Sequence, residues 1–592
     1  MITNLKVKAI SSLTRTGLAM LFILLLFACD TKVDQVEEVS DDSNTLNTFC
    51  NPIDLSYRFR PETNENSRRE AADPTVVFFK DRYYLFASKS GGYWHSFDLT
   101  DWKFIQTDKI PTERYAPTVI VLRDSLFLAG SSKTDRDVYK SGDPLSGEWI
   151  VEDYLDFPVE DPAFFQDTDG KLYLYWGCSN EKPLYGSEID PISFSLIGET
   201  TEILNSKRDI YGWEVRGDYN LDYDRAPWIE GAWVNKYQGK YYFQYSAPGT
   251  REKSYADGVY VSDTPLGEYQ LQQHNPFSYK PEGYSTGAGH GSTITDEYGN
   301  YWHYGTGIVS VKHIFERRIN FFPAFFDEDG LLYSITKYGD YPLIMPETKI
   351  ESFDDIFPSW MLLSYDKQVE VSSSLDSFPA NNMTNESIRT YWAAGSGSEK
   401  EWAIMDLGES YDVHAIQLNF AEHNTEIYGR QEGLKHRYRI LGSNNMKDWE
   451  MVIDQSENSG DESHRYHQLP ASQKYRYLKM ENIEVPGGNL AISGFRVFGK
   501  GSGDKPAKLK KFNVRRDAQD RRRVHLNWSA DSDAVGYNIS FGIAEDKLYH
   551  NYIVYGDSSL TINSLNAKEN YFYTIEAFNE NGITPTEELV AD

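Results

Sequence analysis

Cysteine is scarce in this 592-residue sequence, which contains only Cys29, Cys50 and Cys178. No Cys-x-x-Cys pair occurs, so the sequence lacks the spacing of a cysteine zinc site. Cys50 and Cys178 can form one disulfide in an oxidising compartment, or they can remain two separate buried thiols.

Positive charge is also in short supply. There are 59 Lys and Arg residues against 89 Asp and Glu residues, which gives a formal net charge of −30 at pH 7. Binding to nucleic acid needs a basic surface, so we expect no nucleic-acid partner. Acidity of this size favours solubility and fits a protein that meets neutral ligands.

The sequence contains no apolar run long enough to cross a membrane as a helix. The stretch from Gly17 to Ala28 has 12 residues and follows a basic segment, as in a secretory signal. It ends in Leu26-Phe27-Ala28-Cys29, which resembles a bacterial lipobox. The resemblance implies that residues 1–28 are a lipoprotein signal peptide and that lipidated Cys29 is the only contact with the membrane. An ordinary signal peptide is the alternative.

Residues 29–50 begin with an acidic, polar stretch that runs to Asp42. Such a composition predicts a flexible tether. A similar acidic stretch accompanies surface display in Bacteroidetes-type lipoproteins. The resemblance therefore implies an outer-membrane lipoprotein, on the cell surface or the periplasmic face.

Aromatic residues are abundant, at 15% of the chain, which favours β structure and offers faces for stacking on sugars. A repeat of strand, tight turn and strand occurs five times, and this pattern is typical of β-hairpins. The repeats begin at Asp73, Ala116, Asp161, Glu230 and His290, which lie 43, 45, 69 and 60 residues apart. A four-stranded propeller blade needs about 40–50 residues. We therefore predict an all-β chain whose residues 51–360 form a five-bladed β-propeller. A β-sandwich is the alternative, but it does not predict the same hairpin five times.

The repeat also predicts where chemistry occurs. Equivalent positions in a propeller are related by rotation, so the first residue of each inner strand should lie at one mouth of the central channel. Three carboxylates and one imidazole would then meet in a small pocket. Two carboxylates are the minimal equipment for glycoside hydrolysis, and a third negative charge raises the pKa of the acid.

The motifs at these positions resemble glycoside hydrolase family 43 over about residues 70 to 345. They are Ala72-Asp73-Pro74, Glu160-Asp161-Pro162 with Asp169-Gly170-Lys171-Leu172-Tyr173, Trp228-Ile229-Glu230-Gly231, and Gly289-His290-Gly291. The resemblance implies that Asp73 is the general base, Asp161 the pKa modulator and Glu230 the general acid of an inverting enzyme. Inversion predicts that roughly 6.5–9.5 Å separate the Asp73 and Glu230 carboxyl groups. The alternative is that some of these acids only cap turns.

Further residues are candidates for binding substrate. In the family, a His at the position of His290 lies near the channel axis, where it holds a water or helps to place a calcium ion; a structural His is the alternative. Arg317 or Arg318 could orient substrate, and Glu214 is a competing acid that could instead touch substrate. Trp94 and Trp213 are the preferred sugar platform among several aromatics. No cofactor is required, with structural calcium as an option.

The C-terminal third predicts two further β-sandwiches. Residues 365–500 contain Arg389-Thr390-Tyr391-Trp392 and Phe495-Arg496-Val497-Phe498-Gly499, and they resemble a discoidin (F5/8 type C) domain. Asn385 stands where relatives often carry an acidic residue, which removes support for calcium there. This domain could bind sugar or serve as a spacer. Residues 501–506 form a linker. Residues 507–592, with Leu526-Asn527-Trp528, resemble a fibronectin type III domain.

We therefore expect an exo-acting, inverting glycosidase that removes terminal sugars from plant-type polysaccharide. α-L-arabinofuranosidase comes first and β-xylosidase next, followed by exo-galactanase or galactofuranosidase. A retaining hydrolase would place its two carboxyl groups about 5–5.5 Å apart. A catalytically inactive surface glycan-binding protein is the alternative of a different class, and the intact Asp73, Asp161 and Glu230 argue against it. The expected partner is a polysaccharide or oligosaccharide, and the expected state is a monomer.

Overall fold

The computed structural model describes residues 46–60, 67–529, 532–586 and 588–592. These residues belong to one compact unit, Thr45–Asp592. The predicted signal peptide, Cys29 and most of the predicted tether lie outside the described residues. Within these ranges, no helix has the length and apolar character needed to span a membrane.

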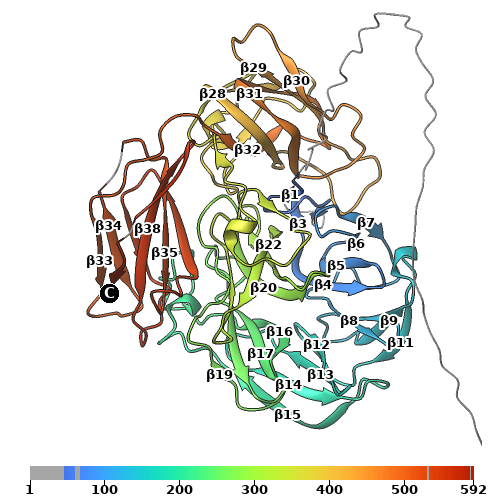
Figure 1. The fold of residues 1–592 in the computed structure, drawn as a ribbon. Coiled ribbons are helices and arrows are strands. Elements are labelled where there is room, and N and C mark those ends of the chain that lie inside the picture. Colours follow the sequence, from blue (N-terminus) through green and yellow to red (C-terminus); the bar gives the residue numbers. More distant parts are fainter. Residues whose placement is uncertain (1–45, 61–66, 530–531, 587) are drawn as a thin grey trace, which may run out of the picture. The chain divides into compact units, whose positions relative to one another are not determined.

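Five four-stranded antiparallel sheets follow one another along the chain, as the repeat predicted (Figure 1). The first blade contains β4 (Ala72–Phe79), β5 (Arg82–Ser88), β6 (Gly92–Ser96) and β7 (Lys103–Gln106). The second contains β8 (Thr118–Leu122), β9 (Ser125–Ala129), β10 (Asp137–Ser141) and β11 (Ile150–Tyr154). The third contains β12 (Ala163–Gln166), β13 (Leu172–Trp176), β14 (Leu184–Ile189) and β15 (Leu196–Leu204).

The fourth and fifth blades carry longer connections but the same strand order. The fourth contains β16 (Glu230–Tyr237), β17 (Lys240–Ala247), β18 (Ala256–Ser262) and β19 (Gln270–Leu271). The fifth contains β20 (Thr286–Thr295), β21 (Tyr301–Ile308), β22 (Arg317–Phe326) and β23 (Leu332–Ser334). The inner strands β4, β8, β12, β16 and β20 contact each other in sequence, and β20 contacts β4. This closed ring is the predicted five-bladed β-propeller.

Two pairs of short strands lie outside the five blades. β1 (Thr48–Phe49) pairs with β24 (Leu343–Ile344), and β2 (Arg58–Arg60) pairs with β3 (Arg68–Glu70). Cys50 follows β1, is buried, and donates a hydrogen bond from its thiol to the Asp340 carbonyl oxygen at 3.3 Å. Cys50 and Cys178 are both free thiols, so the disulfide alternative does not apply. Cys50 is the buried one, whereas Cys178 is partly exposed.

An eight-stranded sheet follows the propeller, in the orange part of Figure 1. Its strands are β25 (Met361–Leu362), β26 (Gln368–Val371), β27 (Trp392–Ala393), β28 (Trp402–Phe420), β29 (Arg437–Ser443), β30 (Glu450–Asp454), β31 (His464–Glu484) and β32 (Ala491–Lys500). The order along the main path is β25-β32-β28-β31-β29-β30. The register of the long strands β28 and β31 shifts twice, and such bulges bend strands. The bent strands enclose an apolar core of their own, which completes the predicted sandwich.

The last segment is a second β-sandwich made of two separate sheets. One sheet contains β33 (Phe512–Arg516), β34 (Val524–Trp528) and β37 (Ser559–Ile562). The other contains β35 (Gly536–Gly542), β36 (His550–Tyr555), β38 (Phe572–Asn579), β39 (Gly582–Pro585) and β40 (Val590–Ala591). Among the described residues, helix is limited to the 3-10 turns η1 (Pro144–Ser146), η2 (Gly212–Glu214), η3 (Phe353–Asp355) and η4 (Ala380–Met383).

Candidate active site

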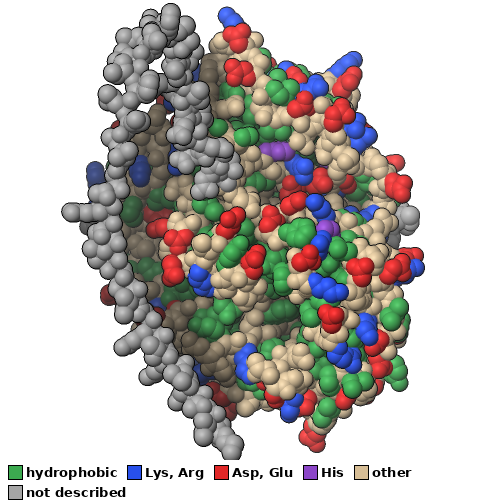
Figure 2. Space-filling view, turned by 45° about the vertical axis from the view of Figure 1, so that its right-hand side comes forward, with side chains coloured by type: hydrophobic (Ala, Val, Ile, Leu, Met, Phe, Trp, Pro, Cys, Tyr) green, Lys and Arg blue, Asp and Glu red, His purple; other side chains and the backbone are tan. Residues whose placement is uncertain are grey.

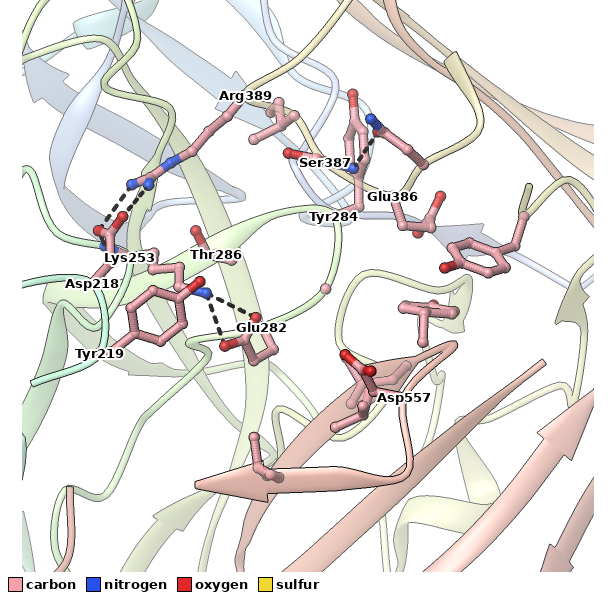
Figure 3. A pocket seen from close by; sticks show the side chains of 18 of the residues that line it. Asp218, Tyr219, Lys253, Glu282, Tyr284, Thr286, Glu386, Ser387, Arg389 and Asp557 are labelled. Carbon is pink, nitrogen blue, oxygen red and sulfur yellow. Dashed lines mark hydrogen bonds and ion pairs between the residues drawn. The ribbon is translucent and has the colours of Figure 1, made fainter. Parts of the chain in front are cut away.

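Two pockets on this chain are lined by charged side chains, and they differ in which residues they bring together. Figure 3 shows a pocket of about 500 Å³ in which Lys253 pairs with Glu282 and Arg389 pairs with Asp218. Both cations of this pocket are therefore paired with carboxylates, and Glu386 and Asp557 line it as further acids. A smaller pocket of about 190 Å³ lies at the propeller's inner strands and is lined by all three predicted catalytic carboxylates. Because it lies at the inner strands and brings Asp73, Asp161 and Glu230 together, this second pocket is the candidate active site.

The backbone at the pocket is held in a rare conformation. Asp73, Ala116, Asp161 and His290 all have left-handed backbone angles, with φ of 52, 45, 48 and 48°. For a residue with a side chain this conformation costs about 1–2 kcal/mol, and such strain concentrates at functional sites. The inner strands thus turn at equivalent points, and each turn directs one side chain toward the channel.

Hydroxyl groups from adjacent blades support these turns. The Ser88 hydroxyl accepts the Ala116 amide at 2.7 Å, and the Ser131 hydroxyl accepts the Asp161 amide at 2.7 Å. In the same way, the Ser246 hydroxyl accepts the His290 amide at 2.6 Å and the Thr306 hydroxyl accepts the Asp73 amide at 2.9 Å. Each of these backbone amides is thus hydrogen-bonded across the contact between two neighbouring blades, here called a seam. These bonds fix the strained backbone.

The fourth blade differs from the predicted register by one residue. In blades one, two and four the left-handed residue precedes a two-residue turn by the same spacing, and in blade four that residue is Gly231, with φ of 66°. A Cβ atom at Gly231 would lie 2.6 Å from the Ser246 hydroxyl, so only glycine fits. Glu230 is therefore not equivalent to Asp73 and Asp161; its side chain enters the pocket from one residue earlier.

Asp73 is held as a carboxylate. Arg317 donates from Nη1 to Oδ1 of Asp73 at 3.0 Å, and the Ser88 hydroxyl donates to Oδ2. Burial on its own raises the pKa of Asp73, but the charges of Arg317 and His290 and these hydrogen bonds outweigh it. The net effect is a pKa below the ordinary value of 3.8. Asp73 is thus ionised at neutral pH and can accept a proton.

Asp161 has the opposite electrostatic environment. Its Oδ1 accepts a hydrogen bond from Ser131 at 3.0 Å, and its Oδ2 lies 3.8 Å from Nδ1 of His290. Burial raises the pKa of Asp161 to about 7; the negative charges of Glu230 and Asp73 act in the same direction, and His290 opposes them. The pocket therefore holds one carboxyl that readily ionises and another that retains its proton.

Glu230 has one donor on each carboxyl oxygen. The Tyr255 hydroxyl donates to Oε1 at 2.6 Å, and the Cys178 thiol donates to Oε2 at 3.1 Å. Ligand atoms of Glu230, Cys178 and Asp161 all lie within 4.8 Å of one another. At this distance the charge of Glu230 contributes to raising the pKa of Asp161.

His290 and Arg317 provide the positive charge of the pocket. Nδ1 of His290 lies 3.4 Å from Oδ1 of Asp73. Burial lowers the pKa of His290, but the carboxylates of Asp73, Asp161 and Glu230 outweigh it, so the net pKa is raised. Arg317 also donates to Glu70 at 2.9 Å and to Thr250 at 3.0 Å, which fixes its guanidinium.

Four residues proposed from the sequence do not line this pocket. Trp94 and Trp213 have no exposed surface: Trp94 packs against Phe104 with ring centroids 5.3 Å apart, and Trp213 packs against Tyr245 at 5.4 Å. A side chain without exposure cannot contact a sugar, so the assignment of these two tryptophans to the sugar platform is corrected: both are core residues.

Glu214 and Arg318 are corrected for similar reasons. Glu214 is fully buried and accepts hydrogen bonds from Ser206 and Tyr245, both at 2.7 Å, so it serves the packing of blade four. Arg318 donates to His464 at 2.6 Å, away from the three acids. Adjacent residues of a strand face opposite sides, so only Arg317 of the pair reaches the pocket.

Two features of the pocket were not assigned from the sequence: its aromatic wall and the thiol of Cys178. Tyr115 and Phe315 line it, with ring centroids 5.3 Å apart, and both rings lie near the Arg317 guanidinium. The available signal for Tyr115 was its position directly before Ala116, the first residue of the second repeat. Phe315 lies in a loop whose path no local pattern predicts.

Two family models match the chain. Residues 66–318 match Glycosyl hydrolases family 43, and residues 368–494 match the F5/8 type C domain. The chain therefore contains a family 43 glycosyl hydrolase domain, which is the propeller, and an F5/8 type C domain, which is the sandwich that follows it. These matches confirm the resemblance of the first segment to glycoside hydrolase family 43 and of the second to a discoidin (F5/8 type C) domain.

Several curated proteins are similar to parts of the chain. A Beta-xylosidase of Xylanibacter ruminicola is 26% identical over 25% of this chain and 47% of its own length. A Xylosidase/arabinosidase of Bacteroides ovatus is 30% identical over 25% of this chain and 49% of its own length. The Beta-D-galactofuranosidase xynD of Aspergillus niger is 27% identical over 39% of this chain and 72% of its own length. The chain thus spans about half the length of the first two relatives.

Proposed function

We propose that this protein is an inverting glycoside hydrolase that removes terminal sugars from plant-type polysaccharide, as an α-L-arabinofuranosidase or a β-xylosidase. The observation that carries the proposal is the contrast between two carboxyl groups in one pocket. The pKa of Asp73 is lowered and that of Asp161 is raised to about 7. Glycosidases need one ionised and one protonated carboxyl group beside the scissile bond. The xylosidase and arabinosidase names of two relatives support the choice of sugar.

In the proposed mechanism, Asp73 accepts a proton from water while the water oxygen bonds to the anomeric carbon. Glu230 gives its proton to the glycosidic oxygen as the bond from that oxygen to the anomeric carbon breaks. Asp161 is the proposed pKa modulator: it lies beside Glu230, and its raised pKa keeps a proton next to that acid. Arg317 holds Asp73 in position. The expected separation of roughly 6.5–9.5 Å between the Asp73 and Glu230 carboxyl groups stays a prediction.

A galactofuranosidase is the second candidate for the activity. It is favoured by xynD, of which this chain covers 72%, the largest share among the three relatives described. Exo-galactanase activity remains an alternative on the same scaffold. A catalytically inactive glycan-binding protein would have no need to keep Asp73 and Asp161 in contrasting protonation states.

The test is hydrolysis of nitrophenyl glycosides together with branched arabinan, xylan and galactan, with the product anomer followed by NMR. We expect release of a monosaccharide of inverted configuration. Retention of configuration would contradict the inverting mechanism. An absence of turnover on every substrate, with polysaccharide still retarding the protein in a binding gel, would favour the inactive glycan-binding alternative.

Activity should depend on pH in a way that Asp161 controls. Because Asp73 ionises below pH 3.8, the acid limb of kcat/KM should lie below that value. Activity should decline as pH rises through about 7, where Asp161 loses its proton. The Asp161→Asn variant removes the carboxyl group that titrates there, so its alkaline limb should move away from pH 7 by about one pH unit or more. An unmoved alkaline limb would contradict the role of Asp161.

We also propose that the chain is a lipoprotein anchored to the outer membrane through Cys29, on the cell surface or periplasmic face. The lipobox-like Leu26-Phe27-Ala28-Cys29 supports this. The Cys29→Ser variant should leave the membrane fraction and appear in the soluble one, measured by immunoblot after detergent partition. A variant that stays in the detergent phase would refute the lipid anchor.

Three further expectations belong with this proposal. We propose that residues 507–592 are a fibronectin type III domain, that the protein is a monomer, and that its partner is a glycan.

Calcium near His290 also stays a proposal. Among the described residues, the group of metal-type side chains that comes together is Asp161, Cys178 and Glu230, without His290. A thiol is a poor ligand for calcium, so these residues do not fit that ion, and the mechanism uses none.

A further inference from the structure

The backbone around Cys178 is fastened to both neighbouring acids. Cys178 follows β13, and the Gly177 amide donates to the Glu160 carbonyl oxygen at 2.8 Å, directly before Asp161. On the other side, Ser179 and Ile229 exchange two backbone hydrogen bonds, at 3.1 and 2.9 Å, directly before Glu230. The thiol is therefore held between the blade-three acid and the blade-four acid.

This seam departs from the pattern of the other four. At the equivalent point of blades one, two, four and five, a Ser or Thr hydroxyl accepts the backbone amide of the next blade. In blade three that point is Gly177, where a Cβ atom would lie 2.7 Å from the Leu184 side chain. The polar side chain moves to the next residue, Cys178, and it contacts the Glu230 side chain instead of a backbone amide.

The chemistry of the contact is that of a weak donor on a carboxyl group. Burial raises the pKa of the Cys178 thiol far above its ordinary value, and the charges of Asp161 and Glu230 raise it further, so the thiol stays protonated. An S–H group donates more weakly than a hydroxyl. It can therefore orient Oε2 of Glu230 while stabilising the ionised carboxylate less than a hydroxyl at the same place would.

We propose that Cys178 is a positioning residue for the proposed acid Glu230, and that its thiol orients the carboxyl group while leaving it able to hold a proton. The proposal rests on the proposed function of Glu230. It explains why a thiol, and not the hydroxyl found at the other seams, lies beside the proton donor. A stronger donor would favour the charged form of Glu230, and no donor would leave Oε2 without a fixed direction.

The test compares Cys178→Ser with Cys178→Ala in pH profiles of kcat/KM. The hydroxyl of Cys178→Ser should move the alkaline limb to lower pH by about 0.5–1 unit, because one ordinary hydrogen bond corresponds to a shift of about that size. Cys178→Ala should move it to higher pH and lower kcat on glycans with poor leaving groups. Ser179→Ala, one residue away, should leave the profile unchanged.

Opposite shifts in the two variants support the proposal, because a purely structural thiol would not move the limb in two directions. Limbs that stay in place, or that move in the same direction in both variants, would overturn it. Thermal melts of both variants establish that a loss of kcat does not arise from unfolding.

A second measurement does not depend on turnover. Iodoacetamide alkylation of the Cys178 peptide is followed by mass spectrometry in the wild type and in Glu230→Gln at one pH. Removing the charge of Glu230 should lower the pKa of the thiol and speed alkylation about three- to tenfold. Equal rates would overturn the proposal. A faster rate in the variant, together with a wild type that hydrolyses no glycoside, would refute the proposed function and leave the thiol contact established.

Discussion

Replacing Asp73 with asparagine is expected to reduce hydrolysis of every glycoside by about 100- to 10,000-fold, the range that a general base contributes. The amide cannot accept the proton of the attacking water. Because the same attacking water must be deprotonated whatever the leaving group, nitrophenyl glycosides and natural glycans should both lose activity. Initial rates on both classes of substrate measure the effect.

A matched control lies in the same blade. Asp81 is in the exposed turn after β4, so Asp81→Asn should retain wild-type rates. Asp73→Asn also leaves the buried Arg317 with Glu70 as its remaining carboxylate partner, which can lower stability. A thermal melt separates that effect from the loss of chemistry. Wild-type turnover by a folded Asp73→Asn protein would eliminate Asp73 as the base.

Replacing Glu230 with glutamine is expected to divide substrates into two groups. Natural glycans, whose leaving oxygen must be protonated, should lose about 100- to 10,000-fold in kcat/KM. Dinitrophenyl glycosides, whose leaving group needs no proton, should lose less than about tenfold. Gln keeps the shape of Glu230, and its single carbonyl oxygen can still accept a hydrogen bond from Tyr255 or Cys178. The other position becomes an NH2 donor, so the comparison between the two groups of substrates, and not the absolute loss, reports on the proton.

Glu188 provides the control for this substitution. It lies on β14 in blade three and pairs with Lys171 at the surface, so Glu188→Gln should act as wild type on both groups of substrates. An equal loss on natural and dinitrophenyl glycosides in Glu230→Gln would show that Glu230 is not the proton donor. Glu214 would not replace it as a candidate, because that carboxyl group is fully buried.

The propeller was predictable because its hairpins recur in the sequence, and strand alternation and turn residues are local signals. The register of blade four was not. Glu230 and Gly231 are adjacent, and the repeat was aligned on the carboxylate of Glu230 instead of on the glycine. The structure shows that the left-handed turn falls on Gly231, where no side chain fits. Matching the turn Gln238–Gly239 with Lys80–Asp81 of blade one places Gly231, and not Glu230, at the position of Asp73.

The three acids and His290 were candidates from the sequence, which left Arg317 and Arg318 undecided and did not indicate the surroundings of these residues. Trp94 and Trp213 are flanked by glycines and polar residues, which suggested exposure, yet both are core residues. Burial depends on contacts between residues far apart in sequence, and composition near a tryptophan does not report them. Cys178 was considered only as half of a disulfide or as a separate buried thiol, because its proximity to Glu230 arises from a bridge between two blades.

The hydroxyl supports between blades have a consequence for how activity relates to folding. Asp73 is braced by Thr306 of the fifth blade, although all three acids precede that blade in the sequence. A chain ending after blade four would contain every catalytic carboxylate and still lack the brace of its base. In the proposed mechanism, turnover therefore requires closure of the ring of blades: partly assembled chains, even those that carry the full set of acids, should be inactive during biosynthesis.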